Sequence, residues 1–285
     1  MLTETEKDLC ASRPNSVSYD RVADLHFLGN YVRRLPVNMA RMMENAHDWE
    51  HLPYVHASSF ASIDLISKGP WGWRAKIGLP GGGEYQLLDL IIDETRHYWV
   101  STVFSGMGTG TEIHTQATEL SGDEIEVDVR FYLPEAPADK SVADFVLNYL
   151  TDQYRVLYDE DLGLMSGRQS ALDDRMARRD EPPGLASVLV GDVSELDPLG
   201  THLVETQAGR FCVRRWRDEW IVHSAICPHM LGPLNEAKLD EHGNITCPWH
   251  GYRFDVATGQ NIGAKCNDLA QAPRLIERNG KLYLD

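Results

Sequence analysis

Cys-Pro-His-Met-Leu-Gly-Pro-Leu at residues 227–234 and Cys-Pro-Trp-His-Gly-Tyr-Arg-Phe-Asp at residues 247–255 decide the fold of the C-terminal part of this chain. Each stretch begins with a cysteine and carries a histidine two or three residues later, and 17 residues lie between His229 and Cys247. Two thiolates and two imidazoles suit a zinc ion, and they also suit a two-iron cluster in which cysteines hold one iron and histidines the other. The spacing therefore predicts a metal centre with four ligands, namely Cys227, His229, Cys247 and His250.

The residues around these ligands resemble, nearly residue for residue, the two cluster-binding loops of Rieske domains. The resemblance covers about residues 185–285, favours the cluster over zinc, and implies an all-β domain with one [2Fe–2S] cluster. Respiratory-chain Rieske proteins tie the loops together with extra cysteines, whereas this chain has Gly232 and Trp249 there. It also has Tyr252 where those proteins place a serine near a cluster sulfur, so we expect a lower, ferredoxin-like or oxygenase-like reduction potential.

A second set of ligand-type residues lies far upstream. Asp48, His51 and His56 have the spacing Asp-x2-His-x4-His. We expect a helix over residues 37–60 that breaks near Pro53 and lets His56 turn back toward His51. Two histidines and one carboxylate on one side of Fe(II) leave positions open for O2 and a substrate. The segment resembles the mononuclear iron site of Rieske non-haem iron oxygenases, in which this aspartate bridges the two metal centres and a late helix supplies the third ligand.

The late helix of this chain is predicted over residues 141–178, and it carries an acidic triplet at residues 159–161. Together with a glutamine eight residues further on, the triplet resembles the ligand segment of the oxygenases. The resemblance implies that Asp161 is the third iron ligand, with Asp159 as the alternative, because sequence does not show which carboxylate points inward. Without a metal, the histidines would be ordinary helix-end residues and the triplet a solvated acidic patch.

Between these two segments, residues 71–133 alternate apolar and polar side chains in about five runs, which predicts an antiparallel meander. Glycine clusters at 81–83 and 106–110 join the runs without opening a helix, so we interpret them as turns and not as phosphate-binding loops. On the late helix, we expect an apolar stripe to face the core. Its members are Val142, Phe145, Val146, Tyr149 and Leu150.

The expected fold class is α+β in two domains. A helix-grip (START-like) antiparallel sheet with a long C-terminal helix is expected at residues 1–177, and the all-β Rieske domain at 185–285. The charged, proline-containing run at residues 178–184 is interpreted as the linker between them. Near the C-terminus, Asn279-Gly280 predicts a tight β-hairpin turn.

The resemblance implies an O2-dependent oxidoreductase that hydroxylates, dihydroxylates or demethylates a small hydrophobic or aromatic substrate. Electrons would pass from the cluster through Asp48 to mononuclear Fe(II). No dinucleotide or flavin motif is evident, so we expect a separate NAD(P)H-dependent reductase, with or without a ferredoxin. The family forms head-to-tail trimers and usually places its Rieske domain first. The reversed order leaves electron transfer within or between subunits open. A Rieske electron-transfer or ligand-binding protein without functional mononuclear iron is the alternative.

Charge and composition narrow the classes of partner. The 285-residue chain has 43 acidic and 27 basic side chains and a formal net charge of −16. This excess repels phosphate backbones and anionic lipid surfaces, so we expect neither nucleic acid nor a membrane as a partner. No targeting segment or membrane-length apolar run is evident, which favours a cytoplasmic protein. Five scattered cysteines are too few for a disulfide framework in a chain of this size.

Overall fold

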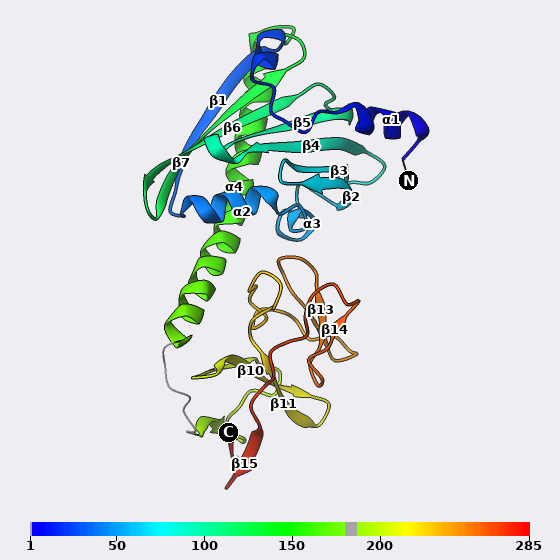
Figure 1. The fold of residues 1–285 in the computed structure, drawn as a ribbon. Coiled ribbons are helices and arrows are strands. Elements are labelled where there is room, and N and C mark those ends of the chain that lie inside the picture. Colours follow the sequence, from blue (N-terminus) through cyan, green and yellow to red (C-terminus); the bar gives the residue numbers. More distant parts are fainter. Residues whose placement is uncertain (1, 180–186) are drawn as a thin grey trace. The chain divides into compact units, whose positions relative to one another are not determined.

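A computed structural model describes residues 2–179 and 187–285 (Figure 1). The chain separates into two compact units, residues 1–165 and residues 166–285. The long helix α4 (Lys140–Arg179) continues past the end of the first unit. Most of the predicted linker at 178–184 lies outside the described residues, so that boundary stays a prediction. Within the described ranges, no helix is both long and apolar enough to cross a membrane.

The first unit is built on a seven-stranded antiparallel sheet with the strand order β1-β7-β6-β5-β4-β3-β2. The predicted five-stranded meander is confirmed as strands β3 to β7, and β1 and β2 complete the sheet at its two edges. β1 pairs with β7 in a register that runs from His26 opposite Leu133 to Leu35 opposite Ile125. The strands are β1 (His26–Leu35), β2 (Ser62–Gly69), β3 (Gly72–Gly78), β4 (Tyr85–Asp93), β5 (Tyr98–Gly106), β6 (Glu112–Ser121) and β7 (Glu124–Leu133).

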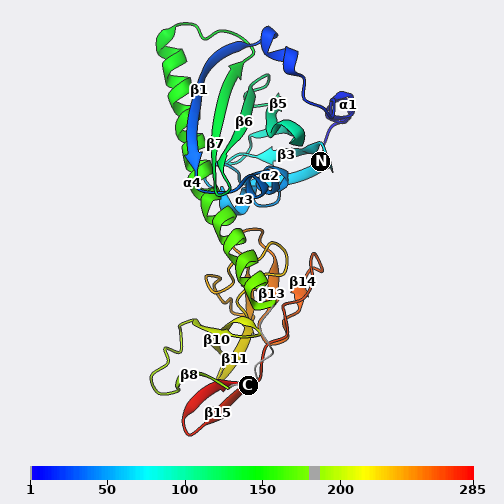
Figure 2. The ribbon, with the colours of Figure 1, turned by 60° about the vertical axis from the view of Figure 1, so that its left-hand side comes forward.

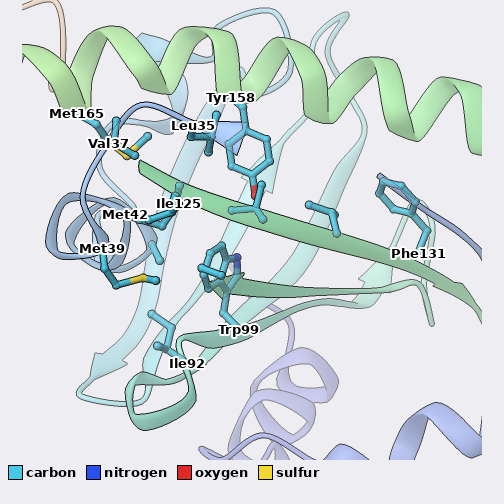
Figure 3. Close-up of a cluster of buried hydrophobic side chains, with 14 residues drawn as sticks. Leu35, Val37, Met39, Met42, Ile92, Trp99, Ile125, Phe131, Tyr158 and Met165 are labelled. Carbon is cyan, nitrogen blue, oxygen red and sulfur yellow. The ribbon is translucent and has the colours of Figure 1, made fainter. Parts of the chain in front are cut away.

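The core of this unit lies between the sheet and α4, which runs along one face of the sheet (Figure 2). On β7, every second residue from Ile125 to Phe131 is fully buried, as the alternating sequence requires. Figure 3 shows Tyr158 and Met165 of α4 facing these strands, with Trp99 of β5 on the same side of the sheet. The helix-grip architecture expected from the sequence is therefore confirmed.

The predicted apolar stripe on α4 is wrong, because three of its five residues are exposed instead of facing the core. Phe145 is 71% exposed and Tyr149 is 60% exposed, and Val142 is also exposed. The helix instead packs its Leu147, Leu150, Tyr154, Tyr158, Leu162 and Met165 positions against the core. Both sets recur at helical spacing and share Leu150, and only the second set faces the sheet.

Two short helices connect β1 to β2, where one interrupted helix was expected over residues 37–60. α2 (Met39–His47) begins after Asn38, whose side chain accepts a hydrogen bond from the N–H of Arg41. It ends before Asp48, whose backbone is not helical (φ −86°, ψ 88°). Pro53 lies in the first turn of α3 (Leu52–Val55), where a missing N–H is tolerated. Continuing α2 through Pro53 would clash with the carbonyl four residues earlier, so the break comes before the proline.

The opposite face of the sheet is covered by the N-terminal segment. α1 (Glu4–Ser12) places Cys10 against Leu87 and Phe104. A short 3-10 turn, η1 (Tyr19–Asp24), leads into β1, and a second, η2 (Glu94–Arg96), joins β4 to β5. Both faces of the sheet are thus packed.

The second unit is all-β beyond the end of α4. Its strands form three-stranded sheets in the orders β11-β10-β9, β12-β13-β14 and β15-β16-β8. Asn279 and Gly280 both have positive φ (52° and 74°) and join the last two strands, so the predicted hairpin is confirmed. The strands are β8 (Val188–Asp192), β9 (His202–Thr206), β10 (Gly209–Trp216), β11 (Glu219–Ser224), β12 (Asn244–Thr246), β13 (Arg253–Asp255), β14 (Asn261–Ile262), β15 (Leu275–Arg278) and β16 (Lys281–Leu284).

Candidate metal centres

Three buried side chains of the first unit converge on one point. His51 precedes α3 and His56 follows it, so this one-turn helix sets the distance between the two imidazoles. Asp161 comes from α4. The Nε2 atoms of the histidines are 3.2 Å apart, and the Oδ1 atom of Asp161 is 3.4 Å from His51 Nε2 and 3.0 Å from His56 Nε2. Sequence reasoning named these three residues, and the structure brings them together.

The separations between these donor atoms fit one side of a metal ion. Bonds of about 2.1 Å that meet at right angles place neighbouring ligand atoms about 3.0 Å apart. The observed distances of 3.0 to 3.4 Å are close to that value. Two imidazoles and one carboxylate are also the donor set of the non-haem iron oxygenases. The residues present therefore fit an Fe(II) ion.

Two further carboxylates lie near the outer nitrogens of the histidine rings. The Oδ2 atom of Asp48 lies 3.5 Å from His51 Nδ1. The Oε2 atom of Glu160 lies 2.7 Å from His56 Nδ1, a contact that sequence reasoning missed. A carboxylate hydrogen-bonded to the outer nitrogen fixes the tautomer and orientation of a metal-ligating histidine, so Glu160 orients the ring of His56.

The alternative third ligand, Asp159, lies elsewhere. Its carboxylate is half exposed and forms an ion pair with Arg33 at 2.6 Å. Asp161 is buried. The two residues are separated by two positions, which places them on different sides of a helix. The geometry therefore favours Asp161 over Asp159.

The electrostatics of the first site reflect close ion pairing. Burial lowers the pKa of His51, but hydrogen bonds with Asp161 and Asp48 outweigh it and raise that pKa to about 10. Burial raises the pKa of Asp161, but hydrogen bonds from both histidines hold it below its ordinary value. The carboxylate is thus ionised, and His51 would have to release a proton to bind a metal ion.

A cavity of about 120 Å³ opens beside these three residues, and its lining lies entirely in the first unit. Most of the wall is apolar, with two tryptophans from the sheet and tyrosines from α4. The lining residues are Met42, Asn45, Ala46, Asp48, His51, Leu52, His56, Phe60, Trp73, Ile77, Leu88, Leu90, Trp99, Ser101, Tyr154, Leu157, Tyr158 and Asp161.

The second unit holds the other four predicted ligands on two loops with the same backbone geometry. In each loop the N–H of the cysteine donates to the carbonyl five residues later, and its carbonyl accepts from the N–H four residues later. These distances are 2.9 and 3.1 Å around Cys227, and 2.8 and 2.9 Å around Cys247. The residue four positions after the cysteine has positive φ in both loops, Leu231 at 62° and Gly251 at 66°. Both cysteines are therefore presented by tight, matching turns.

These turns bring the two cysteines together and the two histidines together. The Cys227 thiol hydrogen-bonds with the Cys247 sulfur, and both residues are fully buried. That bond, opposed by burial and reinforced by a hydrogen bond from His250, lowers the pKa of Cys247 to about 5. The imidazole rings of His229 and His250 lie 4.5 Å apart between centroids. Paired thiols next to paired imidazoles fit a cluster with two cysteines on one iron and two histidines on the other.

Gly232 explains how the loops approach each other without a disulfide. A Cβ atom at this position would lie 2.8 Å from the sulfur of Cys247 and 3.1 Å from the ring of Trp249. Glycine thus leaves room beside the first loop for the indole of Trp249, which belongs to the second loop. The two positions that carry cysteines in respiratory-chain Rieske proteins are in contact here through an aromatic ring.

The sequence from residue 186 to residue 273 matches the Rieske [2Fe-2S] domain family. A 59-residue stretch is 41% identical to flavonoid 8-hydroxylase 2, chloroplastic, of Ocimum basilicum. A 44-residue stretch is 43% identical to pheophorbide a oxygenase, chloroplastic, of Oryza sativa subsp. japonica. The stretches cover 21% and 14% of this chain but only 10% and 8% of those two proteins. The chain therefore matches about a tenth or less of the length of these relatives.

Solved structures are similar to each part of the chain separately. The ferredoxin of carbazole 1,9a-dioxygenase from Nocardioides aromaticivorans IC177 is 24% identical, with a TM-score of 0.32, over 35% of this chain and 96% of that chain. The Zhui aromatase/cyclase from Streptomyces sp. R1128 is 10% identical, with a TM-score of 0.42, over 50% of this chain and 95% of that chain. From the family match, the C-terminal part of this chain is a Rieske domain, which implies a [2Fe–2S] cluster, and its curated relatives include a pheophorbide a oxygenase.

Proposed function

We propose that this chain is a Rieske-type non-haem iron oxygenase. It would oxidise a small, mainly hydrophobic organic substrate with O2 by hydroxylation, dihydroxylation or demethylation. The observation that carries the proposal is the buried convergence of His51, His56 and Asp161 beside an apolar cavity, in a chain that also contains a Rieske domain. An electron carrier has no need of either the three convergent ligands or the cavity.

His51, His56 and Asp161 would hold mononuclear Fe(II), and Cys227, His229, Cys247 and His250 would hold the cluster. When bound by these residues, Fe(II) would supply the activation of O2. Glu160 keeps the Nε2 atom of His56 directed at the shared point by binding its Nδ1 atom. The apolar wall of the cavity would contact and position the substrate beside that point.

Asp48 is proposed as the bridge through which electrons reach this site. Its carboxylate lies 3.5 Å from the outer nitrogen of His51, so only the imidazole ring of His51 separates it from the proposed iron. Electrons would come from the cluster of the same chain or of a neighbouring subunit in a trimer. A separate NAD(P)H-dependent reductase, with or without a ferredoxin, would supply the cluster. The catalytic-first domain order and the cytoplasmic location stay sequence-based predictions.

Iron and sulfide analysis tests the proposal. Protein purified without oxygen should contain three irons and two acid-labile sulfides per chain, with a Rieske signal in the electron paramagnetic resonance spectrum after reduction. It should also consume O2 and form an oxidised product when given a reductase and a substrate. Two irons with two sulfides, and no O2-dependent product, would instead make the protein a Rieske electron carrier.

Changing Asp48 to alanine should separate metal binding from turnover. Both metal centres should remain loaded, because Asp48 contacts a ligand and is not one. Product formation should fall by roughly 10- to 100-fold, the usual cost of removing an outer carboxylate from a metal site. The measurement is the single-turnover oxidation of the reduced cluster, compared with product formed. Asp64→Ala, an exposed carboxylate on β2, is the control. Turnover at the unmodified rate in Asp48→Ala would remove the bridging role.

A further inference from the structure

The size of the cavity beside His51, His56 and Asp161 limits what can enter it. Its volume is about 120 Å³. Cavities of about 150 Å³ lined by apolar side chains bind benzene, whereas pockets for drug-sized ligands measure roughly 300 to 1,000 Å³. The cavity therefore best matches a molecule about as large as one aromatic ring.

The charge of the lining excludes anions of that size. Asp48 and Asp161 contribute carboxylates, and none of the residues that line the cavity is a lysine or an arginine. With Fe(II) in place, as the proposed function requires, the charge of the ion and those of the two carboxylates cancel. An anionic ligand would thus lose part of its hydration beside a mainly apolar wall without meeting net positive charge, which is costly.

One amide oxygen in the lining has no partner. The Oδ1 atom of Asn45, in α2, is buried and makes no hydrogen bond, and the residue as a whole is only 8% exposed. Buried amide oxygens are nearly always hydrogen-bonded, and leaving one unpaired destabilises a protein. Asn45 lines the cavity one helical turn before Asp48. A hydroxyl or N–H group on a molecule in the cavity would supply the missing donor.

We propose that this cavity selects uncharged molecules the size of a single aromatic ring that carry a hydrogen-bond donor, and that Asn45 recognises the donor. The proposal rests on the proposed function only for the identity of the metal. It narrows the substrate class from hydrophobic compounds in general to neutral, one-ring compounds with a hydroxyl or amino group. Asn45 is a specificity-determining residue in this reading and takes no part in the oxidation.

Calorimetric binding to the metal-loaded protein, without reductant, tests the selection in the absence of turnover. Phenol should bind roughly 3- to 10-fold more tightly than toluene, which has a similar shape but no donor. Benzamide should bind and benzoate should not, because only the latter is charged. Naphthalene should bind more weakly than toluene. Equal affinity for phenol and toluene, or binding of benzoate as tight as that of benzamide, would overturn the proposal.

The variant Asn45→Leu tests the assigned residue. It should bind phenol and toluene equally, while Met42→Leu, which alters the same wall without changing a polar group, should keep the preference for phenol. Toluene binding shows that the cavity of each variant is intact, and Asn45→Ala replaces Asn45→Leu if the larger side chain prevents folding. An unchanged preference in the Asn45 variant would overturn its role. If protein with only two irons still prefers phenol to toluene and benzamide to benzoate, the oxygenase function is wrong and the proposed ligand selection holds.

Discussion

Replacing Asp161 with alanine should remove one iron from each chain and leave the cluster intact. Asp161 supplies one of three convergent donor atoms, 3.0 Å from His56 Nε2, and two imidazoles alone make a weaker site. Iron should fall from three to two per chain while acid-labile sulfide stays at two. Product formation should fall by more than the roughly 100-fold that loss of an outer carboxylate can cause. Elemental analysis and product assays on the same preparation measure both effects.

The neighbouring carboxylates provide matched controls. Asp159→Ala should keep three irons, since that side chain is half exposed and paired with Arg33. Glu160→Gln should lower the affinity for the third iron by roughly 10- to 100-fold without abolishing binding, because it orients His56 and does not contact the metal. If Asp159→Ala loses the iron and Asp161→Ala keeps it, the ligand assignment is wrong.

Replacing Cys247 with serine should have the opposite effect on the two centres. Its sulfur lies beside that of Cys227 in a fully buried position, and a serine hydroxyl is a poor ligand for a cluster iron. The variant should lose two irons and both sulfides per chain and retain the mononuclear iron. The Rieske absorbance and the paramagnetic signal of the reduced protein should disappear, and O2-dependent product formation should stop because no electrons reach the iron.

Cys212→Ser is the control for placing a hydroxyl in a buried position of the same unit. Cys212 is fully buried on β10, and burial raises the pKa of its thiol to about 11. This variant should lose stability and keep both iron and sulfide. Zinc without sulfide in the unmodified protein would contradict the cluster assignment and restore the zinc alternative that the four ligand types also allow.

Local sequence patterns predicted the parts of this structure that depend on local chemistry. Alternation over residues 71–133 predicted five strands because one face of each strand is buried. Asn-Gly predicted the hairpin turn because both residues tolerate positive φ. The spacing of His51 and His56 predicted their convergence because a proline-containing turn separates them.

The features that sequence did not supply depend on which surfaces meet. Phe145 and Leu147 both belong to helical repeats on α4, and only the sheet decides which of them is buried. Glu160 was overlooked because its role depends on where the ring of His56 lies. The cavity and the unpartnered oxygen of Asn45 arise from side chains of several strands and helices, so no single segment encodes them.

The pairing of β1 with β7 has a consequence for biosynthesis. His26 is made more than 100 residues before its partner Leu133, so at 5–20 residues per second β1 waits roughly 5–20 s on the ribosome before its edge is covered. The two histidines follow β1 directly, but Asp161 emerges only after the whole sheet. Until then, a nascent chain offers the two imidazoles of the proposed site without its carboxylate ligand, Asp161. Iron delivered during translation would find two of three ligands, and loading must therefore follow the docking of α4.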